Sequence, residues 1–369
     1  MEQQPTMETM VKAELLKKTY QGKKVFLTGH TGFKGSWLVL MLQQLGATVK
    51  GYSLAPVNKN DLYNLINGDE FCDSQIADIR AKDTLVNSMV EFQPDFVIHM
   101  AAQALVIDSY LYPVETYATN VMGTVHVLEG LRKLEKPCTS ILITTDKVYW
   151  NFEQDTPYAE DDRLGGYDPY SNSKACADLT INSYQKSFFN LNDFDKHQQG
   201  IATVRSGNVI GGGDWAENRI IPDCIKALRN KEAINVRNPH AVRPWQHVLD
   251  PLYGYLLLGK YLAEQPKLYS EALNFGPETD DVKTVEDLVN IVIKTWGSGE
   301  VNFPKVEKKL HEAGLLKLDI AKAKEKLHWH PTYKAQTAIE KTVEWYLKAE
   351  NDAVAITIEQ INDFFNTQA

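Results

Sequence analysis

A tyrosine and a lysine four residues apart are the first side chains whose spacing suggests catalysis. Tyr170 and Lys174 belong to the segment YSNSK, and on a helix this spacing puts both side chains on one face. A neighbouring ammonium group favours the phenolate, so we expect it to lower the pKa of the tyrosine hydroxyl. Such a tyrosine can act as a general base on an alcohol during hydride transfer.

A second group of reactive side chains follows a predicted strand at 140–144. Thr145, Asp146 and Lys147 supply a hydroxyl, a carboxyl and an amine in sequence. Ligands of open α/β sheets bind at the carboxyl ends of parallel strands, which is where these residues would lie. A solvated loop pair is the alternative for Asp146 and Lys147, and the YxxxK helix disfavours it.

Three glycines indicate a site for a dinucleotide. The segment GHTGFKG holds Gly29, Gly32 and Gly35 between a predicted strand at 25–28 and a predicted helix at 33–45. The first glycine permits a tight turn, the second lets backbone N–H groups approach a pyrophosphate, and the third permits close helix–strand packing. An ordinary glycine turn is the alternative, but the strand–loop–helix context favours dinucleotide binding.

The acidic residue that usually follows such a loop by about 20 positions is missing. The next predicted strand, at 47–53, leads into GYSL at 51–54, which has neither a carboxylate nor an arginine. The missing arginine disfavours NADP, and the missing carboxylate suggests that NAD is held loosely. Asp78 and Ile79 are the candidates for the adenine contact.

Strands and helices alternate through the first half of the chain, which predicts an α/β fold with a Rossmann-like, doubly wound parallel sheet. Further strands are expected at 95–100, 140–144 and 201–205, and helices at 82–92, 114–134 and 170–188. The polar segment 191–200 is expected to be a surface loop. After 210, glycine and proline become more frequent between predicted helices at 220–230, 248–263 and 285–295, which suggests a smaller C-terminal substrate-binding α/β subdomain.

This pattern divides the chain into four parts. They are an N-terminal extension (1–21), a Rossmann domain for NAD (22–209), a mainly substrate-binding subdomain with some segments returning to the Rossmann domain (210–349), and a C-terminal tail (350–369). The tail carries a weak amphipathic pattern and receives no role.

The composition narrows the class of protein. The 369 residues include 43% hydrophobic and 24% charged residues, which is typical of globular proteins and excludes a disordered chain. A net charge of −9 argues against a nucleic-acid partner. The N-terminus resembles no signal peptide and no apolar run is long enough to span a membrane.

The cysteines and histidines give no sign of a disulfide framework or a metal site. The four cysteines are widely spaced without a CxxC pair, so we expect free thiols in a reducing cytoplasm and no membrane partner. His328 and His330 lie two residues apart without a nearby carboxylate cluster, and we interpret them as part of a packed turn at a helix end.

Several motifs, in order along the chain, resemble the extended short-chain dehydrogenase/reductase superfamily and, within it, the CDP-glucose 4,6-dehydratases. The resemblance extends from about Gly22 to Ala349. It is carried by GKKVFLTGHTGFKGSW at 22–37, HMAAQ at 99–103, NVMGT at 120–124, GYDPYSNSK at 166–174, GNVIGGGDW at 207–215 and RPWQHV at 243–248. One departure is ALVID at 104–108, where the family usually has a proline and then an arginine.

The resemblance implies an enzyme that removes water from CDP-glucose through an internal redox cycle on NAD and so feeds deoxysugar synthesis for surface polysaccharides such as lipopolysaccharide O-antigen. Tyr170 would take the proton of the sugar 4-hydroxyl while hydride passes from C4 to NAD, and Thr145 would hydrogen-bond the same oxygen. Asp146 would protonate the departing 6-hydroxyl. Lys147, where most nucleotide-sugar dehydratases carry glutamate, would be the candidate base for the C5 proton.

The resemblance also implies binding residues and a homodimer. Together with the glycine loop, the candidates for NAD are Gly29, Thr31, Gly32, Phe33, Gly35, Asp78, Ile79, Ala101, Ala102, Asn120, Tyr170 and Lys174. The candidates for the nucleotide sugar are Asn208, Arg219, Arg243, His311 and Glu312. The planar fork of arginine suits phosphate oxygens. Family members usually dimerise through a four-helix bundle, here from the predicted helices at 114–134 and 170–188.

Two other functions stay open from the sequence. A 4-epimerase, or a dehydratase for another nucleotide base, would share this fold, although the Asp146–Lys147 pair argues against an epimerase. A catalytically silent NAD-binding regulator is the more distant alternative, which the intact Tyr170, Lys174 and Thr145 disfavour. The selectivity for cytosine rests on the resemblance alone.

Overall fold

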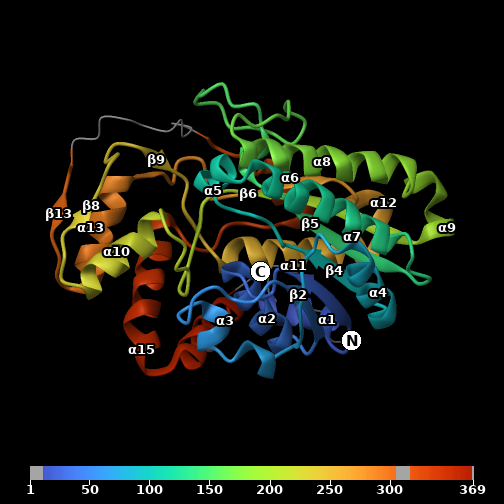
Figure 1. Cartoon of the computed structure of the whole chain (residues 1–369), viewed down its shortest axis with the longest axis horizontal. Coiled ribbons are helices and arrows are strands. Elements are labelled where there is room, and N and C mark those ends of the chain that lie inside the picture. Colours follow the sequence, from blue (N-terminus) through green and yellow to red (C-terminus); the bar gives the residue numbers. More distant parts are fainter. Residues whose placement is uncertain (1–10, 305–315, 368–369) are drawn as a thin grey trace, which may run out of the picture.

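The computed structural model describes residues 11–304 and 316–367, and a seven-stranded parallel sheet forms its centre (Figure 1). The strand order is β11-β6-β5-β4-β1-β2-β3. These strands are β1 (Lys24–Thr28), β2 (Thr48–Ser53), β3 (Asp73–Ile76), β4 (Phe96–His99), β5 (Cys138–Ile143), β6 (Gln199–Ser206) and β11 (Ala272–Phe275). The predicted α/β fold with a doubly wound parallel sheet is confirmed.

The strand order reverses between β1 and β4, which creates the crevice where open α/β sheets bind ligands. Thr28 pairs in register with His99, and His99 pairs with Leu142. The carboxyl ends of β1, β4 and β5 therefore meet at one edge. Every residue of β5 and β6 is buried, as expected for parallel strands that are covered on both faces.

Helices cover both faces of the sheet (Figure 1). On one face, α4 (Lys82–Phe92), α7 (Gly123–Leu131) and α8 (Pro169–Ser187) enclose a core that includes Phe26 and Val97. On the other face lie α2 (Phe33–Gln44) and α11 (Leu249–Glu264), which join the larger core. The helix expected at 114–134 consists of α6 (Pro113–Tyr117), a π-helical turn (Ala118–Met122) and α7.

The remaining helices are α1 (Lys12–Tyr20), α3 (Leu62–Leu65), α5 (Val106–Leu111), α9 (Phe194–His197), α10 (Ile220–Arg229), α12 (Pro266–Tyr269), α13 (Val285–Trp296), α14 (Ala321–Leu327) and α15 (Ala335–Phe365). The remaining strands form three pairs, β7 (Val209–Ile210) with β10 (Gln246–His247), β8 (Ile234–Asn235) with β13 (Val301–Asn302), and β9 (Val242–Arg243) with β12 (Lys283–Thr284). Helices α10 and α13 and strands β8 and β13 gather at the left of Figure 1, away from α7 and α8.

The prediction of a surface loop at 191–200 is wrong in part. A 3-10 turn (Leu191–Asp193) and α9 occupy the segment, and β6 begins at Gln199. Gln199 is buried, and its Nε2 lies 2.9 Å from the carbonyl oxygens of both Lys136 and His197. The polar side chain hid the start of the strand, because one of the carbonyl groups that satisfy it, that of Lys136, is 63 residues away in the sequence.

The segment expected to be an unassigned tail continues α15 and packs on the core. Asp352 has non-helical angles (φ −159°, ψ 99°), which divide α15 into two arms. Nε1 of Trp345 on the first arm donates to Oγ1 of Thr357 on the second at 2.8 Å. At the end of the second arm, the backbone N–H of Lys12 donates to the Thr367 carbonyl at 3.1 Å, so the tail reaches back to α1.

Across the described residues, none of the helices combines the length and the apolar character that crossing a bilayer requires. The four cysteines are free thiols. Cys138 and Cys224 are buried, and Cys72 and Cys176 are half-buried.

Candidate active site

The glycine loop between β1 and α2 leaves space in front of the helix N-terminus. Gly29 has φ +78°, and a Cβ there would lie 2.8 Å from the backbone nitrogen of Ala101. A Cβ on Gly35 would lie 2.0 Å from the carbonyl oxygen of Gly29. Gly32 is the N-cap of α2, and the nearest atom to a Cβ there would be the carbonyl oxygen of Gly29, at 3.4 Å. The loop therefore fits the pyrophosphate of a dinucleotide, which the first N–H groups of a helix can bind.

The His30 ring packs against the backbone of β2 at Gly51. The His30 ring lies so close to Gly51 that a Cβ on Gly51 would be 2.3 Å from it. Nε2 of His30 lies 2.8 Å from Oγ of Ser74, and burial lowers the pKa of His30 to about 4. Beside it, the Thr31 hydroxyl donates to the Leu54 carbonyl at 2.8 Å. A neutral imidazole thus leaves no room for a side chain at position 51, and at the end of β2 the Ser53 hydroxyl accepts from the Thr31 hydroxyl at 2.9 Å.

Asp78 and Ile79 follow β3 near the same edge of the sheet. The Tyr52 hydroxyl, at the end of β2, donates to the Asp78 carbonyl at 3.1 Å. The Arg80 guanidinium lies 2.6 Å from the Asp78 carboxylate and lowers its pKa. Ile79 is buried, and a Cβ on Gly123 would lie 2.9 Å from its Cγ2.

Asn120 joins the loop after β4 to the helix that carries Tyr170. Its Oδ1 accepts from the backbone N–H of Gln103 at 2.8 Å, and its Nδ2 donates to the Gln103 carbonyl at 3.0 Å and to Oγ of Ser173 at 2.9 Å. The N–H of Ala101, in the same loop, donates to Oγ1 of Thr28 at 3.2 Å. Ala102 lies between these two anchored positions, so the loop is fixed against both β1 and α8.

Lys174 is buried at the carboxyl end of β5. Its Nζ donates to the carbonyl of Ile143 at 2.8 Å. Burial lowers the pKa of Lys174 to about 8, the charge of Lys34 adds to this effect, and the charge of Asp178 opposes it. Tyr170 lies one turn earlier, just after the N-cap Asp168, whose carboxylate accepts from the Ser171 N–H at 2.9 Å.

Burial, not the lysine, dominates the acidity of Tyr170. It raises the pKa of the phenol to about 12, and the interactions that oppose this include a hydrogen bond with the Thr145 side chain and the charge of Arg219. The expected lowering of the tyrosine pKa is therefore wrong, because burial outweighs the interactions that favour the phenolate. Nζ of Lys147 lies 6.0 Å from the centre of the Tyr170 ring, so the turn after β5 and the start of α8 face each other.

Asp146 is a buried carboxyl in a 3-10 turn (Asp146–Val148) directly after β5. The Thr145 hydroxyl accepts from the Lys147 N–H at 3.4 Å and donates to Oδ1 of Asp146 at 2.9 Å. Burial raises the pKa of Asp146, and the charges of Lys147 and Arg243 oppose the rise. A carboxyl whose pKa is raised retains its proton more readily and suits a general acid.

A cavity beside Asp146 contains part of the predicted substrate region. It is lined by Gly207, Pro244, the residues 276–279 and Lys317, among others. Arg243 precedes Pro244 in the chain, and its charge acts on Asp146. The carbonyl of Asn208, next to Gly207, accepts from the Gln246 N–H at 3.0 Å. His311 and Glu312 lie outside the described residues.

Arg219 is joined to an acidic neighbour. Its Nη1 donates to Oδ2 of Asp214 at 2.8 Å. The charge of Arg219 also acts on Tyr170, which brings it close to the catalytic group that the sequence predicted.

Lys34 is a site residue that sequence reasoning missed. Its Nζ donates to the Tyr255 hydroxyl at 2.9 Å and lies 3.4 Å from Oγ of Ser206. Burial lowers the pKa of Lys34 to about 7; the charge of Arg219 adds to this effect, and that of Asp146 opposes it. The one signal in the sequence was its place next to Gly35, in the first turn of the helix that follows the glycine loop.

No cluster of three histidine, cysteine, aspartate or glutamate side chains suitable for a metal occurs in the part of the chain that the structure describes. His328 has φ +53° and is the C-cap of α14. Trp329 is buried after it, with its ring 4.9 Å from that of Phe275. The interpretation of this segment as a packed turn at a helix end is confirmed.

Known proteins similar to this chain include nucleotide-sugar enzymes. Residues 26–342 match the model of the family described as GDP-mannose 4,6 dehydratase. A CDP-glucose 4,6-dehydratase from Salmonella typhimurium is 44% identical over 353 residues, which cover 95% of this chain and 98% of the relative.

Two solved structures have the same fold. The epimerase Mth375 from Methanothermobacter thermautotrophicus has a TM-score of 0.77 at 20% identity, over 95% of this chain and 97% of its own. The dTDP-glucose 4,6-dehydratase DesIV from Streptomyces venezuelae, solved with NAD and TYD bound, has a TM-score of 0.74 at 22% identity, over 89% of this chain and 97% of its own.

Proposed function

This chain belongs to the GDP-mannose 4,6 dehydratase family, and from that membership we propose that it is a CDP-glucose 4,6-dehydratase. As a hydro-lyase, it converts CDP-D-glucose to CDP-4-dehydro-6-deoxy-D-glucose and water. The observation that carries the proposal is the 44% identity with a curated CDP-glucose 4,6-dehydratase over nearly the whole of both chains. The buried Asp146 beside Tyr170 and Lys147 supports it, because the elimination needs an acid and a base close to the alcohol base.

The cofactor that we assign is NAD. The turn at Gly29 and the open N-terminus of α2 at Gly32 fit its pyrophosphate. Asp78 and Ile79 are assigned to the adenine, and Lys174 to the side nearer the reacting sugar. When bound, NAD supplies a reversible hydride acceptor, so a complete turnover needs no external reductant.

Tyr170 takes the proton from the sugar 4-hydroxyl in this mechanism. The phenol must first lose its own proton, which burial resists. The charge of Arg219 and the hydrogen bond with Thr145 favour the phenolate, and any further positive charge near the ring acts in the same direction. Thr145 can also hold the sugar O4 oxygen while the ketone forms.

Asp146 and Lys147 carry out the elimination. The ketone at C4 makes the C5 proton acidic, and the amine of Lys147 removes it. The C6–O bond then breaks while Asp146 gives its proton to the departing hydroxyl, so that water leaves and a C5–C6 double bond forms. Lys147 would return its proton to C5 as C6 receives the hydride that the bound cofactor would supply, which restores Lys147. Asp146 would regain a proton from Tyr170, which holds the one taken from O4, so that both of these groups are restored as well.

The doubly charged diphosphate requires positive donors, for which we propose Arg219 and Arg243, with Asn208 as a neutral donor. In this assignment the Rossmann part, 22–209, holds the cofactor, and 210–349 supplies most contacts to the nucleotide. His311 and Glu312 stay candidates from the sequence. Each arginine has a partner inside the protein, since Arg219 bonds to Asp214 and Nη1 of Arg243 donates to the Val242 carbonyl at 3.0 Å.

A panel of CDP-, dTDP-, GDP- and UDP-glucose tests the function. Incubation with added NAD should convert CDP-glucose to a product lighter by one water, and Tyr170→Phe should not. An isomer of unchanged mass would indicate an epimerase, and an unchanged substrate across the panel would indicate a silent binder. Conversion of another nucleotide sugar in preference to CDP-glucose would keep the reaction class and change the substrate.

We propose that the enzyme is a homodimer formed through α6, the π-helical turn and α8. Large apolar side chains are exposed on these elements, including Val114, Met122 and Leu179. Leu179→Arg combined with Met122→Glu should yield a monomer in size-exclusion chromatography with light scattering. Leu268→Arg, at a similarly exposed leucine on α12, is the control, and a dimer that survives the first pair of changes would contradict the assignment.

We further propose that the enzyme works in the cytoplasm, where a nucleotide sugar and free thiols such as Cys72 and Cys176 are both expected. Its product then enters deoxysugar synthesis. Fractionation of cells that express the chain, with the activity assayed in each fraction, tests this location.

A further inference from the structure

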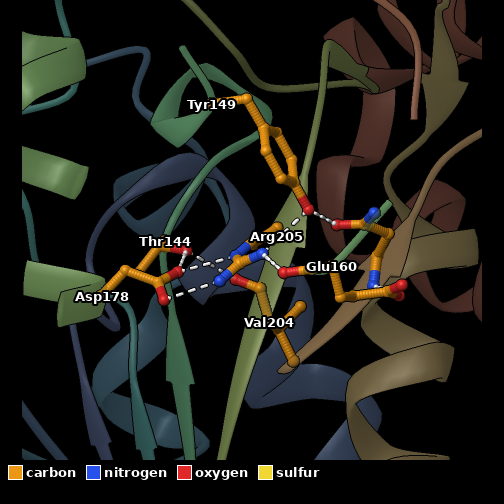
Figure 2. Close-up of polar contacts among 7 residues, drawn as sticks. Thr144, Tyr149, Glu160, Asp178, Val204 and Arg205 are labelled. Atoms are coloured by element: carbon orange, nitrogen blue, oxygen red, sulfur yellow. Dashed lines mark hydrogen bonds and ion pairs between the residues drawn. The ribbon is translucent and has the colours of Figure 1, made fainter. Parts of the chain in front are cut away.

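Arg205 and Asp178 form a buried ion pair between β6 and α8 (Figure 2). Nε and Nη2 of Arg205 donate to Oδ2 and Oδ1 of Asp178, each at 2.8 Å. The two side chains are 4% and 5% exposed. Removing two charges from water costs free energy, so a buried ion pair is by itself weak evidence for a gain in stability. The other contacts of this pair are therefore of interest.

The Asp178 carboxylate also binds the strand that leads to the catalytic turn. The Thr144 hydroxyl donates to Oδ2 of Asp178 at 3.0 Å, and the Thr144 N–H donates to the Val204 carbonyl at 2.8 Å. Thr144 is the residue before Thr145, and Asp178 lies one helical turn after Lys174. One carboxylate therefore connects the end of β5 to the helix that carries both Tyr170 and Lys174.

The other end of Arg205 reaches the segment after the catalytic turn. Its Nη1 donates to the Tyr149 hydroxyl at 2.9 Å and to the Glu160 carbonyl at 2.8 Å. The Tyr149 hydroxyl donates in turn to Oδ1 of Asn274 on β11 at 2.7 Å. Residues 276–279, directly after β11, line the cavity beside Asp146. Figure 2 shows Asp178, Tyr149 and Glu160 around the Arg205 guanidinium.

We propose that Asp178 and Arg205 are positioning residues of the dehydratase reaction, which hold the Thr145–Asp146–Lys147 turn at a fixed alignment to Tyr170. This inference rests on the proposed function. Within the described residues, neither side chain is among those that line the cavity beside Asp146, so they act through Thr144 and Tyr149. The alignment matters because the proton transfers at O4, C5 and O6 use groups from two separate elements, and a misplacement of about 1 Å can cost roughly a hundredfold in rate.

The charge of Asp178 affects the pH profile of the activity, which a residue with a purely structural role would not change. It raises the pKa of Lys174 against the lowering by burial and by Lys34 of α2. Burial lowers the pKa of the neighbouring His99 on β4 to about 3, and the charge of Lys174 adds to this effect, so the imidazole stays neutral. Replacing Asp178 by asparagine should therefore lower the pKa of Lys174 further, so that the alkaline limb of the pH profile moves to lower pH.

Thr144→Val is the first test, because it breaks one hydrogen bond to Asp178 and leaves the ion pair intact. We expect kcat with CDP-glucose to fall roughly tenfold, with KM changed by less than about twofold. Thr357→Val is the matched control: Thr357 is also buried, and the change removes the hydrogen bond from Trp345 and the one that its hydroxyl donates to the Ala353 carbonyl. It should lower the melting temperature and leave kcat unchanged.

Asp178→Asn is the second test, with an expected loss in kcat of about a hundredfold and an alkaline limb at lower pH. The double variant with Thr144→Val should lose little more than Asp178→Asn alone, because both act through one link. Should Asp178→Asn fail to fold, Tyr149→Phe replaces it. That change removes one of the two hydrogen bonds that Nη1 of Arg205 donates and should also lower kcat without raising KM.

The proposal is wrong if these variants keep the wild-type kcat and an unshifted alkaline limb and only their melting temperature falls. The ion pair would then have a structural role alone. Failure of the proposed function looks different, because the wild-type chain itself would not convert CDP-glucose. In that case the same variants are compared on whichever nucleotide sugar the panel identifies.

Discussion

Gly207 leaves room for the carboxylate of Asp146: a Cβ at position 207 would lie 2.7 Å from Oδ2 of Asp146. Gly207 directly follows β6, and Asp146 follows the neighbouring strand β5. The residue type at the end of one strand thus determines where the acid at the end of the next can lie.

Gly207→Ala should displace the Asp146 carboxyl and lower kcat by about a hundredfold, while the affinity for CDP-glucose changes much less. Steady-state kinetics and calorimetric titration measure the two effects. Gly200→Ala, at the other end of β6, is the control, because its new methyl group would meet the Leu262 side chain at 3.3 Å. Equal kcat in the Gly207 variant and the wild type would show that Asp146 need not occupy this position.

Asp146→Asn should lower kcat by roughly a hundredfold to ten-thousandfold, because asparagine cannot protonate the departing hydroxyl. Burial raises the pKa of Asp146, so the wild-type carboxyl keeps its proton up to a higher pH than an exposed aspartate would. The asparagine variant has no such proton to give. Binding of CDP-glucose, measured by titration, should persist. A variant that released water at the wild-type rate would assign the acid to another residue.

Lys147→Ala should abolish the exchange of the C5 proton for deuterium in heavy water, because the amine that removes this proton is gone. Mass spectrometry of the recovered product and substrate measures the exchange. Lys196→Ala, at an exposed lysine on α9, is the control. Wild-type exchange in the Lys147 variant would assign the C5 base to a different group.

Asp250 should make the stability of the protein depend on pH. Its carboxylate on α11 accepts from the Thr332 N–H at 2.6 Å and the Tyr333 N–H at 3.3 Å, yet burial raises its pKa from 3.8 to about 7. The stability that comes from the bound proton is present below about pH 4 and is lost as the pH rises through about 7.

Asp250→Asn has no such titration, so the free energy of unfolding of the wild type, relative to the variant, should fall as the pH rises across this window. The fall is at most on the order of 4 kcal/mol. Urea unfolding of both proteins at the two ends of the window measures it. Parallel pH dependences in the two proteins would contradict this role of Asp250.

Much of the sheet could be predicted from the sequence because its central strands are buried on both faces. The segments around Phe26, Val97 and Ile141 are short apolar runs between helical patterns. The edge strands escaped prediction for the opposite reason. β3 (Asp73–Ile76) is a partly exposed polar strand without an apolar run, and β11 has four residues, whose place in the sheet depends on pairing with β6.

The candidate site divides in the same way. Motifs that are local in sequence, such as Tyr170–Lys174, could be found because helical spacing fixes their geometry. Lys34 could not, since its partner Tyr255 is 221 residues away. Likewise, neither Asp178 nor Arg205 carries a motif, and their role depends on a contact between a helix and a strand. The acidity of Tyr170 was misjudged because its burial depends on the whole fold.

The contact between Lys12 and Thr367 joins residues 355 positions apart, with Nζ of Lys12 donating to Oγ1 of Thr367 at 2.6 Å. Helix α1 therefore leaves the ribosome long before its cover on α15. During that interval the Lys12 side chain lacks the Phe364 ring, which lies 5.2 Å from its Nζ in the folded protein. This corner of the molecule can close only after α15 has been synthesised, so the packing of the first described helix waits for the last one.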